Sequence, residues 1–395
     1  MNPNERAQQG EIPGMFQCPL LGEKRTFRGL VAMSADDPEP TLSGTILCGA
    51  LQDLLYLLSD PRPGECKPMR RREFIGLLGA AVIIWADDSV AQPSAKTYRL
   101  ASLTGNVPLS VNRSDAKSLL NAMAQHGYTL GKNLAYDARG AGGELAKIPQ
   151  LIEDFKASGV DVLVTVGYPA ARSAKAAGIP TVIAYGSGDP VATGLVKSLA
   201  KPGSTVTGIS DDAALLSTKR LSLLRSLSPN IRKIAMLWNK NDLGMSLRYE
   251  ASAKAAQELG VTVQALGVQE PDDFNDAFTG MDRDRPDAIL MVSDSLTTLN
   301  RKRVFDYAAA KRLPAIYEYD ALVRDGGLMS YGPDLDECFE RAAAMVDHIF
   351  KGAKPSELPF EQPTRYRFMI NLKTAKALGL EIPPTLLALA DEVIE

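Results

Sequence analysis

Hydroxyl, carboxylate and aromatic side chains recur directly after the apolar segments that are predicted to be β-strands. In parallel α/β sheets the carboxyl ends of the strands meet at one edge, where ligands bind beside helix N-termini. Residues at these positions are therefore candidate ligand-binding residues. They are Ser102, Thr104, Gly167, Tyr168, Tyr185, Ser187 and Asp189, followed later in the chain by Asn239, Ser293, Asp294, Ser295, Glu318 and Tyr319. Asp211 is added because it lies where the chain is expected to cross between two domains.

These side-chain types suit an amino acid or a similar small organic acid as ligand. Hydroxyls and helix N–H groups bind a carboxylate, an acidic side chain binds an ammonium group, and aromatic rings cover an apolar side chain. Each residue also has a purely structural interpretation. Ser295 suits a helix cap, Asp189 suits a turn before Pro190, and Tyr185 suits packing in a half-buried strand. Both interpretations remain open at this point.

Catalytic and metal-binding motifs are missing from the sequence. It contains no GxxxxGK[ST], GxSxG or HExxH motif. The only histidines are His126 and His348, and three of the four cysteines fall within the first 66 residues, which leaves Cys338 alone later in the chain. We therefore expect no enzyme activity, no cofactor and no metal site.

Composition and charge indicate a globular protein of two domains. The 395 residues exceed the usual size of one domain, and 45% of them are hydrophobic while 23% are charged. The net charge of -3 and the absence of a basic cluster after residue 100 argue against a nucleic-acid partner. The later part of the chain also contains no apolar run long enough to enter a membrane.

An α/β pattern appears twice along the chain, which predicts two lobes. Short apolar strands alternate with helical segments from residue 98 onward, as in doubly wound parallel sheets. The helix-ending glycines Gly127 and Gly260 recur about 133 residues apart, and so do Pro180 and Pro314. The first lobe is expected to comprise 97–208 plus 333–352, and the second 209–332 plus 353–395. Several chain crossovers would then form a hinge that closes around a ligand, with Trp238 beside the cleft.

An export signal is predicted at 69–91. It combines the basic segment MRRREFI at 69–75, a short apolar run to residue 85, and the small residues SVA at 89–91, which suit a cleavage site. The two arginines before Glu73 also match the twin-arginine pattern, so both this route and general secretion stay open. Residues 1–68 precede the signal and are expected to be a mis-annotated extension, with a genuine extension as the alternative.

Several segments resemble one family, the ABC-transporter substrate-binding proteins of the tryptophan/tyrosine-binding type. The similarity runs from Met69 to the C-terminus, and its most specific segments are GDPV at 188–191, KPGSTVTG at 201–208, GGLMSYGPD at 326–334, NLKTAKALGL at 371–380, PPTLL at 383–387 and ADEV at 390–393. The resemblance implies a type I periplasmic-binding-protein fold, periplasmic export, and delivery of a small ligand, by a monomer, to an inner-membrane permease with a cytoplasmic ATPase. The chain departs from the family at Tyr168, where members commonly have Thr, and this departure bears on the ligand's identity.

Two other classes of function are compatible with the same pattern. A ligand-sensing protein would use the same two lobes to dock on a membrane receptor instead of a permease. A small-molecule enzyme is the less favoured alternative, because the recognised catalytic motifs are missing.

Overall fold

The structure is a computed structural model that describes residues 96–210 and 213–395. All of the described residues belong to one compact unit, which ends at Glu395. The extension predicted at 1–68, the signal predicted at 69–91, and Asp211 lie outside the described residues. No helix in the described ranges is long and apolar enough to span a bilayer.

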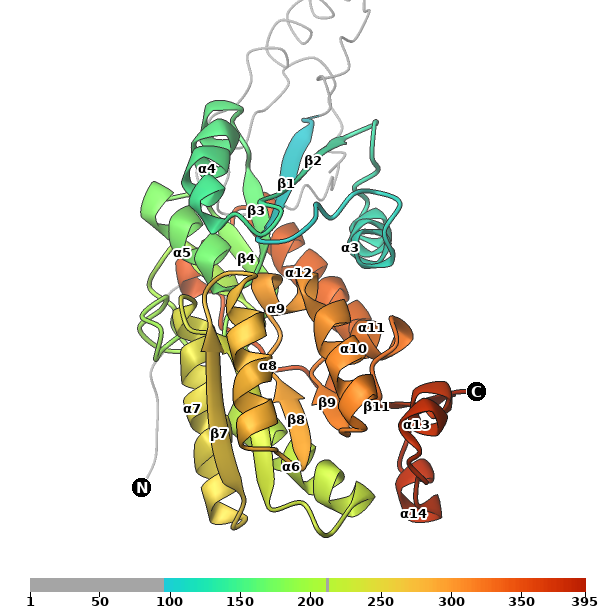
Figure 1. The fold of residues 1–395 in the computed structure, drawn as a ribbon. Helices are drawn as coiled ribbons and strands as arrows, with labels where there is room; N and C mark the ends of the chain where they lie inside the picture. The colour runs from blue at the N-terminus through green and yellow to red at the C-terminus, as the bar shows by residue number, and fades with distance from the viewer. Residues whose placement is uncertain (1–95, 211–212) are drawn as a thin grey trace, which may run out of the picture. The chain divides into compact units, whose positions relative to one another are not determined.

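The first sheet is parallel throughout, with strand order β2-β1-β3-β4-β5 (Figure 1). Its strands are β1 (Tyr98–Thr104), β2 (Leu134–Gly140), β3 (Val162–Val166), β4 (Thr181–Tyr185) and β5 (Val206–Gly208). Its helices are α3 (Ser114–Gln125), α4 (Ile148–Ala157) after the short η1 (Leu145–Lys147), α5 (Tyr168–Ala177) and α12 (Leu335–Phe350). Helices cover both faces, which explains why the strands are apolar along their whole length: Leu100 packs with α3 and α12, whereas Ala101 packs with α4 and α5.

The second sheet has strand order β12-β11-β10-β9-β8-β6-β7. Its strands are β6 (Lys233–Asn239), β7 (Thr262–Val268), β8 (Ala288–Met291), β9 (Ala315–Tyr317), β10 (Met329–Pro333), β11 (Tyr366–Asn371) and β12 (Glu392–Ile394). Its helices are α6 (Ala213–Leu227), α7 (Leu243–Glu258), α8 (Asp273–Arg283), α9 (Ser295–Leu299), α10 (Arg301–Lys311), α11 (Asp320–Arg324), α13 (Leu372–Leu378) and α14 (Pro384–Leu387). The predicted architecture of two doubly wound α/β lobes is confirmed, with one antiparallel pair, β10 and β11.

The chain passes between the two sheets three times. It leaves the first sheet after β5, returns after β10 so that α12 packs on α3 and β4, and leaves again before β11. The last crossing comes later than the sequence suggested, because the segment from η2 (Pro355–Glu357) to Glu361 still belongs to the first lobe. The Thr207 hydroxyl donates to the carbonyl of Leu358 at 2.8 Å, and Ile209 pairs with Glu361. The exact residues at which one lobe ends and the other begins stay predictions.

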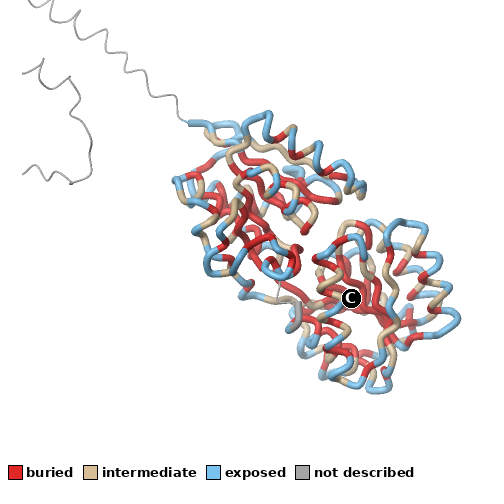
Figure 2. Tube along the Cα trace, turned by 90° about the vertical axis from the view of Figure 1, so that its left-hand side faces the viewer, coloured by how far each residue is buried: buried red, intermediate tan, exposed pale blue. Residues whose placement is uncertain are grey.

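Each lobe has its own core. Buried residues gather in separate clusters around the two sheets (Figure 2). The three connections, and not a shared core, therefore join the lobes. This arrangement is expected of a hinge, because bending at a few connecting residues leaves both cores intact.

Candidate ligand-binding cleft

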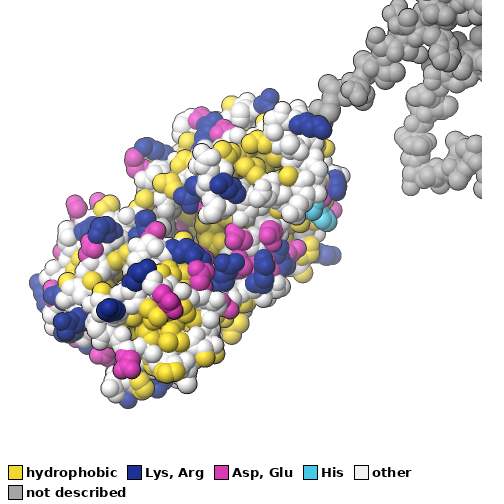
Figure 3. Space-filling model, turned by 90° about the vertical axis from the view of Figure 1, so that its right-hand side faces the viewer, with side chains coloured by type: hydrophobic (Ala, Val, Ile, Leu, Met, Phe, Trp, Pro, Cys, Tyr) yellow, Lys and Arg dark blue, Asp and Glu magenta, His cyan; other side chains and the backbone are white. Residues whose placement is uncertain are grey.

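A cavity of about 630 Å³ lies between the lobes and is lined by residues from both. We call it the cleft cavity. Its volume falls within the range of roughly 300–1,000 Å³ that is usual for small-molecule sites. Figure 3 shows a hollowed region with apolar side chains, bordered by charged side chains of both signs. The candidate residues that line the cleft cavity are Thr104, Gly167, Tyr185, Ser293, Asp294, Ser295 and Tyr319.

The first lobe contributes the ends of three neighbouring strands. β1 lies between β2 and β3, and β3 pairs with β4, so Thr104, Gly167 and Tyr185 come together at one edge. The Thr104 hydroxyl donates to the carbonyl of Val107 at 2.8 Å, which holds the loop after β1. Gly167 has a φ of 88°, a conformation that favours glycine, and it starts α5 at the cavity wall.

The second lobe contributes the loops after β8 and β9. Asp294 caps α9: its carboxylate accepts hydrogen bonds from the backbone N–H and the hydroxyl of Thr297. Its other oxygen accepts from Asn239 Nδ2 at 2.6 Å. The cap that sequence analysis considered for Ser295 therefore belongs to Asp294, while Ser295 lines the cavity.

Two tyrosines meet across the cleft. Tyr185 from the first lobe and Tyr319 from the second have ring centroids 5.2 Å apart and an interplanar angle of 69°. Edge-to-face rings of this kind present both a flat apolar surface and a hydroxyl. Tyr185 is also in edge contact with Phe339 of α12, which fixes its orientation. The pair can cover an apolar or aromatic group of a ligand.

A second carboxylate, which sequence analysis missed, lies in the cleft cavity beside Asp294. Asp242 caps α7, and its Oδ1 accepts hydrogen bonds from the N–H groups of Gly244 and Met245. Burial, with the nearby charge of Asp294, raises the pKa of Asp242 to about 7. Burial also raises the pKa of Asp294, in spite of its hydrogen bonds. The available sequence signal was a helix-capping Asp three residues after a strand end.

Charged residues at the rim of the cleft cavity pair with one another. Arg113 Nη2 lies 2.7 Å from Asp115 Oδ2, and Arg301 Nε lies 2.7 Å from Asp325 Oδ2. Arg367 on β11 reaches Asp334, the N-cap of α12, at 3.0 Å. These pairs are partly exposed, so each contributes little to stability, but together they fix the edges of the opening. Sequence analysis missed them: the partners of Arg301 and Arg367 are distant in the chain, and nothing in the local sequence shows that Arg113 and Asp115 lie at the rim.

Six other candidate residues do not line the cleft cavity. The Ser102 hydroxyl bonds to Tyr136 Oη at 2.7 Å within the sheet, and the Ser187 hydroxyl donates to the carbonyl of Gly188. Asp189 is exposed and accepts from two N–H groups of the following turn, as its structural interpretation predicted. Asn239 is buried behind Asp294, to which it donates a hydrogen bond. The last two candidates, Glu318 and Tyr168, also lie outside the cleft cavity.

Glu318 is buried behind the cavity wall between two arginines. Its Oε1 accepts from Arg220 Nη1 at 2.9 Å, and its Oε2 accepts from Arg248 Nη1 at 2.6 Å and from the backbone N–H of Ser293 at 2.9 Å. Glu318 and Arg220 are 1% and 2% exposed, so this group is shielded from solvent. Arg220 Nε also donates to the carbonyl of Tyr331. Glu318 therefore connects α6, α7 and β10 to the loop that presents Ser293.

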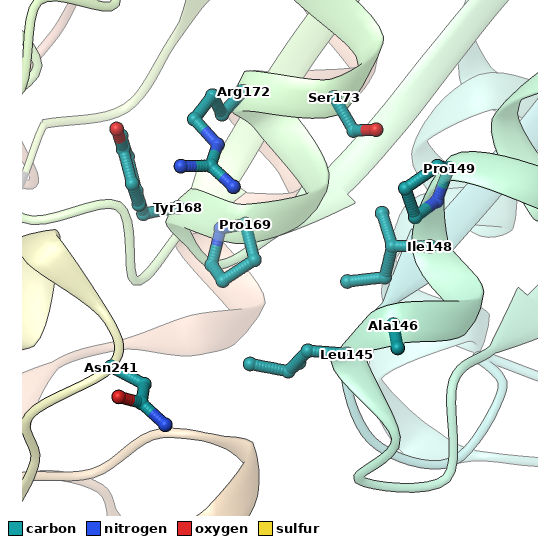
Figure 4. Close-up of a pocket in the computed structure, with 9 residues that line it drawn as sticks. All are labelled: Leu145, Ala146, Ile148, Pro149, Tyr168, Pro169, Arg172, Ser173 and Asn241. Atoms are coloured by element: carbon teal, nitrogen blue, oxygen red, sulfur yellow. The ribbon is translucent and has the colours of Figure 1, made fainter. Parts of the chain in front are cut away.

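Tyr168 lies beside a second, smaller cavity of about 340 Å³ (Figure 4), which we call the side cavity. Leu145 and Pro169 line both cavities, so the two are neighbours. The Tyr168 side chain is buried in an apolar cluster with Ile183 and Phe360, and Arg172 lies 5.7 Å from its ring centroid. The Tyr168 ring therefore takes up no space in the cleft cavity.

Replacing Tyr168 by Thr, the residue common in the family, is expected to affect stability much more than ligand binding. Losing the buried ring removes apolar contacts and leaves a void, at a cost of about 3 kcal/mol. Ligand affinity is expected to change less than about threefold, because the ring does not line the cleft cavity. Urea denaturation and ligand titration of the same preparation measure the two effects. A large loss of affinity with unchanged stability would contradict this placement.

Trp238 is not beside the cleft, contrary to the sequence prediction. Its ring stacks on Tyr249 of α7 at 3.7 Å, with an interplanar angle of 5°, and it does not line the cleft cavity. The reason is the alternation of side chains along β6: Asn239, the next residue, points towards Asp294, while Trp238 packs against α7.

The backbones of the two lobes approach closely at glycines. A Cβ on Gly244 of α7 would lie 2.6 Å from the carbonyl oxygen of Ser187 in the first lobe, and one on Gly188 would lie 2.8 Å from the carbonyl oxygen of Gly244. A Cβ on Gly143 would lie 2.7 Å from Leu299 Cδ1 of α9. The lobes are therefore in direct contact along the cleft, in a closed arrangement.

The fold and the cleft together define a two-lobed protein that binds small molecules, with the architecture of type I periplasmic binding proteins. The chain belongs to the ABC transporter substrate binding protein family, whose model matches residues 112–394. The family resemblance seen in the sequence is thus confirmed. This is a family of substrate-binding proteins, not of enzymes, and its members typically act outside the cytoplasm.

Named relatives include proteins that bind aromatic amino acids. A tyrosine-binding protein of Clostridioides difficile (strain R20291) is 25% identical over 67% of this chain and 76% of that protein. A domain from Streptococcus pneumonia, solved in complex with L-Trp, is 26% identical with a TM-score of 0.70 over 76% of this chain and all of that chain. A conserved domain protein from Vibrio cholerae has the same identity and TM-score over 75% of this chain and 100% of that chain.

Proposed function

We propose that this chain is the periplasmic receptor of an ABC importer, and that it binds an amino acid with an aromatic or branched side chain, or a similar organic acid, between its lobes. The observation that carries the proposal is a cavity of about 630 Å³ lined from both lobes, with Tyr185 facing Tyr319 and two carboxylates beside them. The tyrosine- and tryptophan-binding relatives support an aromatic ligand.

A comparison of binding free energies shows which contacts the ligand needs. An aromatic side chain buries about 150–250 Å², which stabilises the complex by roughly 4–6 kcal/mol at about 25 cal/mol per Å². A micromolar complex requires about 8 kcal/mol after the cost of losing translational and rotational freedom. The tyrosine pair alone is therefore insufficient. Polar groups in the cleft cavity, among them Thr104, Ser293, Asp294 and Ser295, would have to supply the remainder.

Closure of the lobes is the proposed mechanism. The ligand would enter an open cleft and then hold the lobes together, because it contacts both of them only in the closed form. An inner-membrane permease, driven by a cytoplasmic ATPase, would recognise that closed form. We further propose that the protein acts as a monomer, exported through the signal at 69–91.

A thermal-shift screen of the purified protein tests this proposal. The panel contains the twenty L-amino acids, indole-3-propionate, 3-phenylpropionate and benzoate. At least one compound is expected to raise the Tm in a concentration-dependent way, because a ligand that binds only the folded state stabilises it. No shift with any compound at millimolar concentration would contradict the proposed ligand class. Chemical conversion of a binding compound, without ATP or a partner, would contradict the receptor role.

A further inference from the structure

Asp242 and Asp294 form an acidic pair in the wall of the cleft cavity. Each caps a helix that begins at the cavity, α7 for Asp242 and α9 for Asp294. Asp242 is only 3% exposed. Neither carboxylate forms an ion pair with a residue in the described part of the chain. Asp294 is half-buried. Carboxylates that are withdrawn from solvent without a cation are costly in a protein, so this arrangement calls for a positive partner.

Polar atoms beside the acidic pair are also without partners. Asp242 uses Oδ1 for both of its capping hydrogen bonds, and its Oδ2 makes none with the described residues. The Ser293 hydroxyl lines the same cavity, is buried, and has no hydrogen-bond partner within 96–210 and 213–395. A buried hydroxyl without a partner, like that of Ser293, is rare in native proteins, and a bound ligand is one of the few explanations.

The neighbouring cations are already engaged. Arg248 on α7 is close enough to Asp242 to lower its pKa, but it binds Glu318, which also holds Arg220 of α6. Across the cavity the first lobe presents Arg113, paired with Asp115. The remaining charged residues that line the cleft cavity are Arg301, Asp320, Arg324, Asp325, Asp334, Asp336 and Arg367. The ion pairs of these arginines go to other carboxylates, and Arg301 also donates to the carbonyl of Thr298, so the acidic pair keeps its negative character.

We infer that Asp242 and Asp294, with the Ser293 hydroxyl, form a subsite for the ammonium group of the ligand, and that binding of this group releases a proton from the acidic pair. The inference deepens the proposed function and rests on it. In the empty closed cleft the pair retains a proton, because two neighbouring carboxylates that are largely withdrawn from solvent do not both ionise easily. The ammonium N–H groups donate to the carboxylates and stabilise both in the ionised form. The displaced proton passes to water, so charge and atoms balance.

The direction of the pH dependence follows from this exchange. Burial and the charge of Asp294 raise the pKa of Asp242 to about 7, so protonation competes with the ammonium group below that pH. Affinity is expected to fall as the pH drops below about 7, by up to about tenfold per pH unit where one full proton is released. Above that range the pair is ionised and affinity is expected to level off.

Calorimetric titration with L-tryptophan and L-tyrosine tests the inference. Titrations at pH 7 in two buffers of different ionisation enthalpy give the number of protons released, which is expected to lie between zero and one. Indole-3-propionate and 3-(4-hydroxyphenyl)propionate, which lack the amino group, are expected to bind at least about tenfold more weakly and to release no proton. Asp242→Asn retains a good helix cap and is expected to abolish the release and flatten the pH profile. The matched control, Asp306→Asn, changes an exposed carboxylate of α10 and should behave as wild type.

The outcomes separate this inference from the proposed function. Amino-acid binding without proton release between pH 6 and 8, together with unchanged pH dependence in Asp242→Asn, would overturn the acidic subsite and leave the receptor role standing. Equal affinity for amino acids and their amine-free analogues would do the same. Failure of every amino acid to bind would overturn the acidic subsite, and failure of the organic acids as well would also overturn the proposed function.

Discussion

Gly244→Ala is expected to weaken ligand binding by about tenfold or more while leaving the unliganded protein at least as stable as wild type. The added Cβ would lie 2.6 Å from the carbonyl oxygen of Ser187 and 3.1 Å from Tyr168 Cβ, both in the opposite lobe. Neither a backbone carbonyl nor a Cβ can rotate out of the way, so the lobes must remain further apart. If the closed state loses only about 1.4 kcal/mol relative to the open state, affinity falls about tenfold.

Within the second lobe the added Cβ would lie 3.2 Å from Asp242 Oδ1, a contact that a small rotation of this carboxylate relieves. Gly244 lies in the first turn of α7, and alanine is favoured over glycine in helices by up to about 1 kcal/mol. The effect on binding therefore cannot arise from unfolding. Gly280→Ala is the matched control, because Gly280 also lies in a helix, α8, and its added Cβ would meet only Leu266 at 3.5 Å. Calorimetry and urea denaturation of both variants make the comparison, and equal ligand affinity in the two would show that Gly244 does not limit closure.

Glu318→Gln is expected to reduce the free energy of unfolding by about 3–5 kcal/mol. The substitution removes the carboxylate that Arg220 and Arg248 share, and leaves both guanidinium groups buried without that charge. It also weakens the hydrogen bond from the Ser293 N–H, so the cavity wall loses a support. Losses of this size are a large part of the stability of an ordinary domain.

The matched control for Glu318 is Asp306→Asn. Asp306 pairs with Lys302 on the surface of α10, where the two side chains are 65% and 82% exposed, and the loss of such a pair costs no more than about 0.5 kcal/mol. Urea denaturation of the two variants gives the difference directly. A cost for Glu318→Gln as small as that of the control would mean that the buried group does not hold α6, α7 and β10 together.

The parts of the cleft that follow strand ends could be predicted from the sequence. Tyr185 ends β4, and Ser293 and Tyr319 each lie two residues after a buried strand, β8 and β9. Parallel pairing brings such positions to one edge of a sheet whatever the rest of the fold. Ser102 and Asn239 satisfy the same rule only in part. Asn239 ends β6 and Ser102 lies two residues before the end of β1, but the alternation of side chains along the strand and their hydrogen bonds place both behind the wall.

The features that sequence analysis missed depend on contacts between distant residues. Asp242 lies in the loop after β6, and its proximity to Asp294 arises only when β6 and β8 pair. Glu318 has the residue type and position of a ligand contact. Its burial became apparent only once α6 and α7 placed Arg220 and Arg248 against it. No local pattern identifies a carboxylate that is neutralised by two helices far away in the chain.

Tyr168 illustrates the same limit for ligand identity. From the sequence, a large ring at the start of α5 was expected to alter the pocket. The structure places this ring against Ile183 and Phe360, and Phe360 lies in the first lobe just before the last crossing, far from Tyr168 in the chain. The departure from the family at this position therefore gives no reason to exclude an aromatic amino acid.

A calorimetric titration of the amino acid that gives the largest thermal shift tests the central claim most directly. It is carried out with the wild-type protein, with Tyr185→Ala, with Tyr319→Ala, and with Tyr307→Ala as a control outside the cleft cavity. We predict one ligand per wild-type chain, an affinity at least about tenfold lower for each cleft variant, and no change for the control. Unchanged affinity in both cleft variants would contradict binding between the lobes.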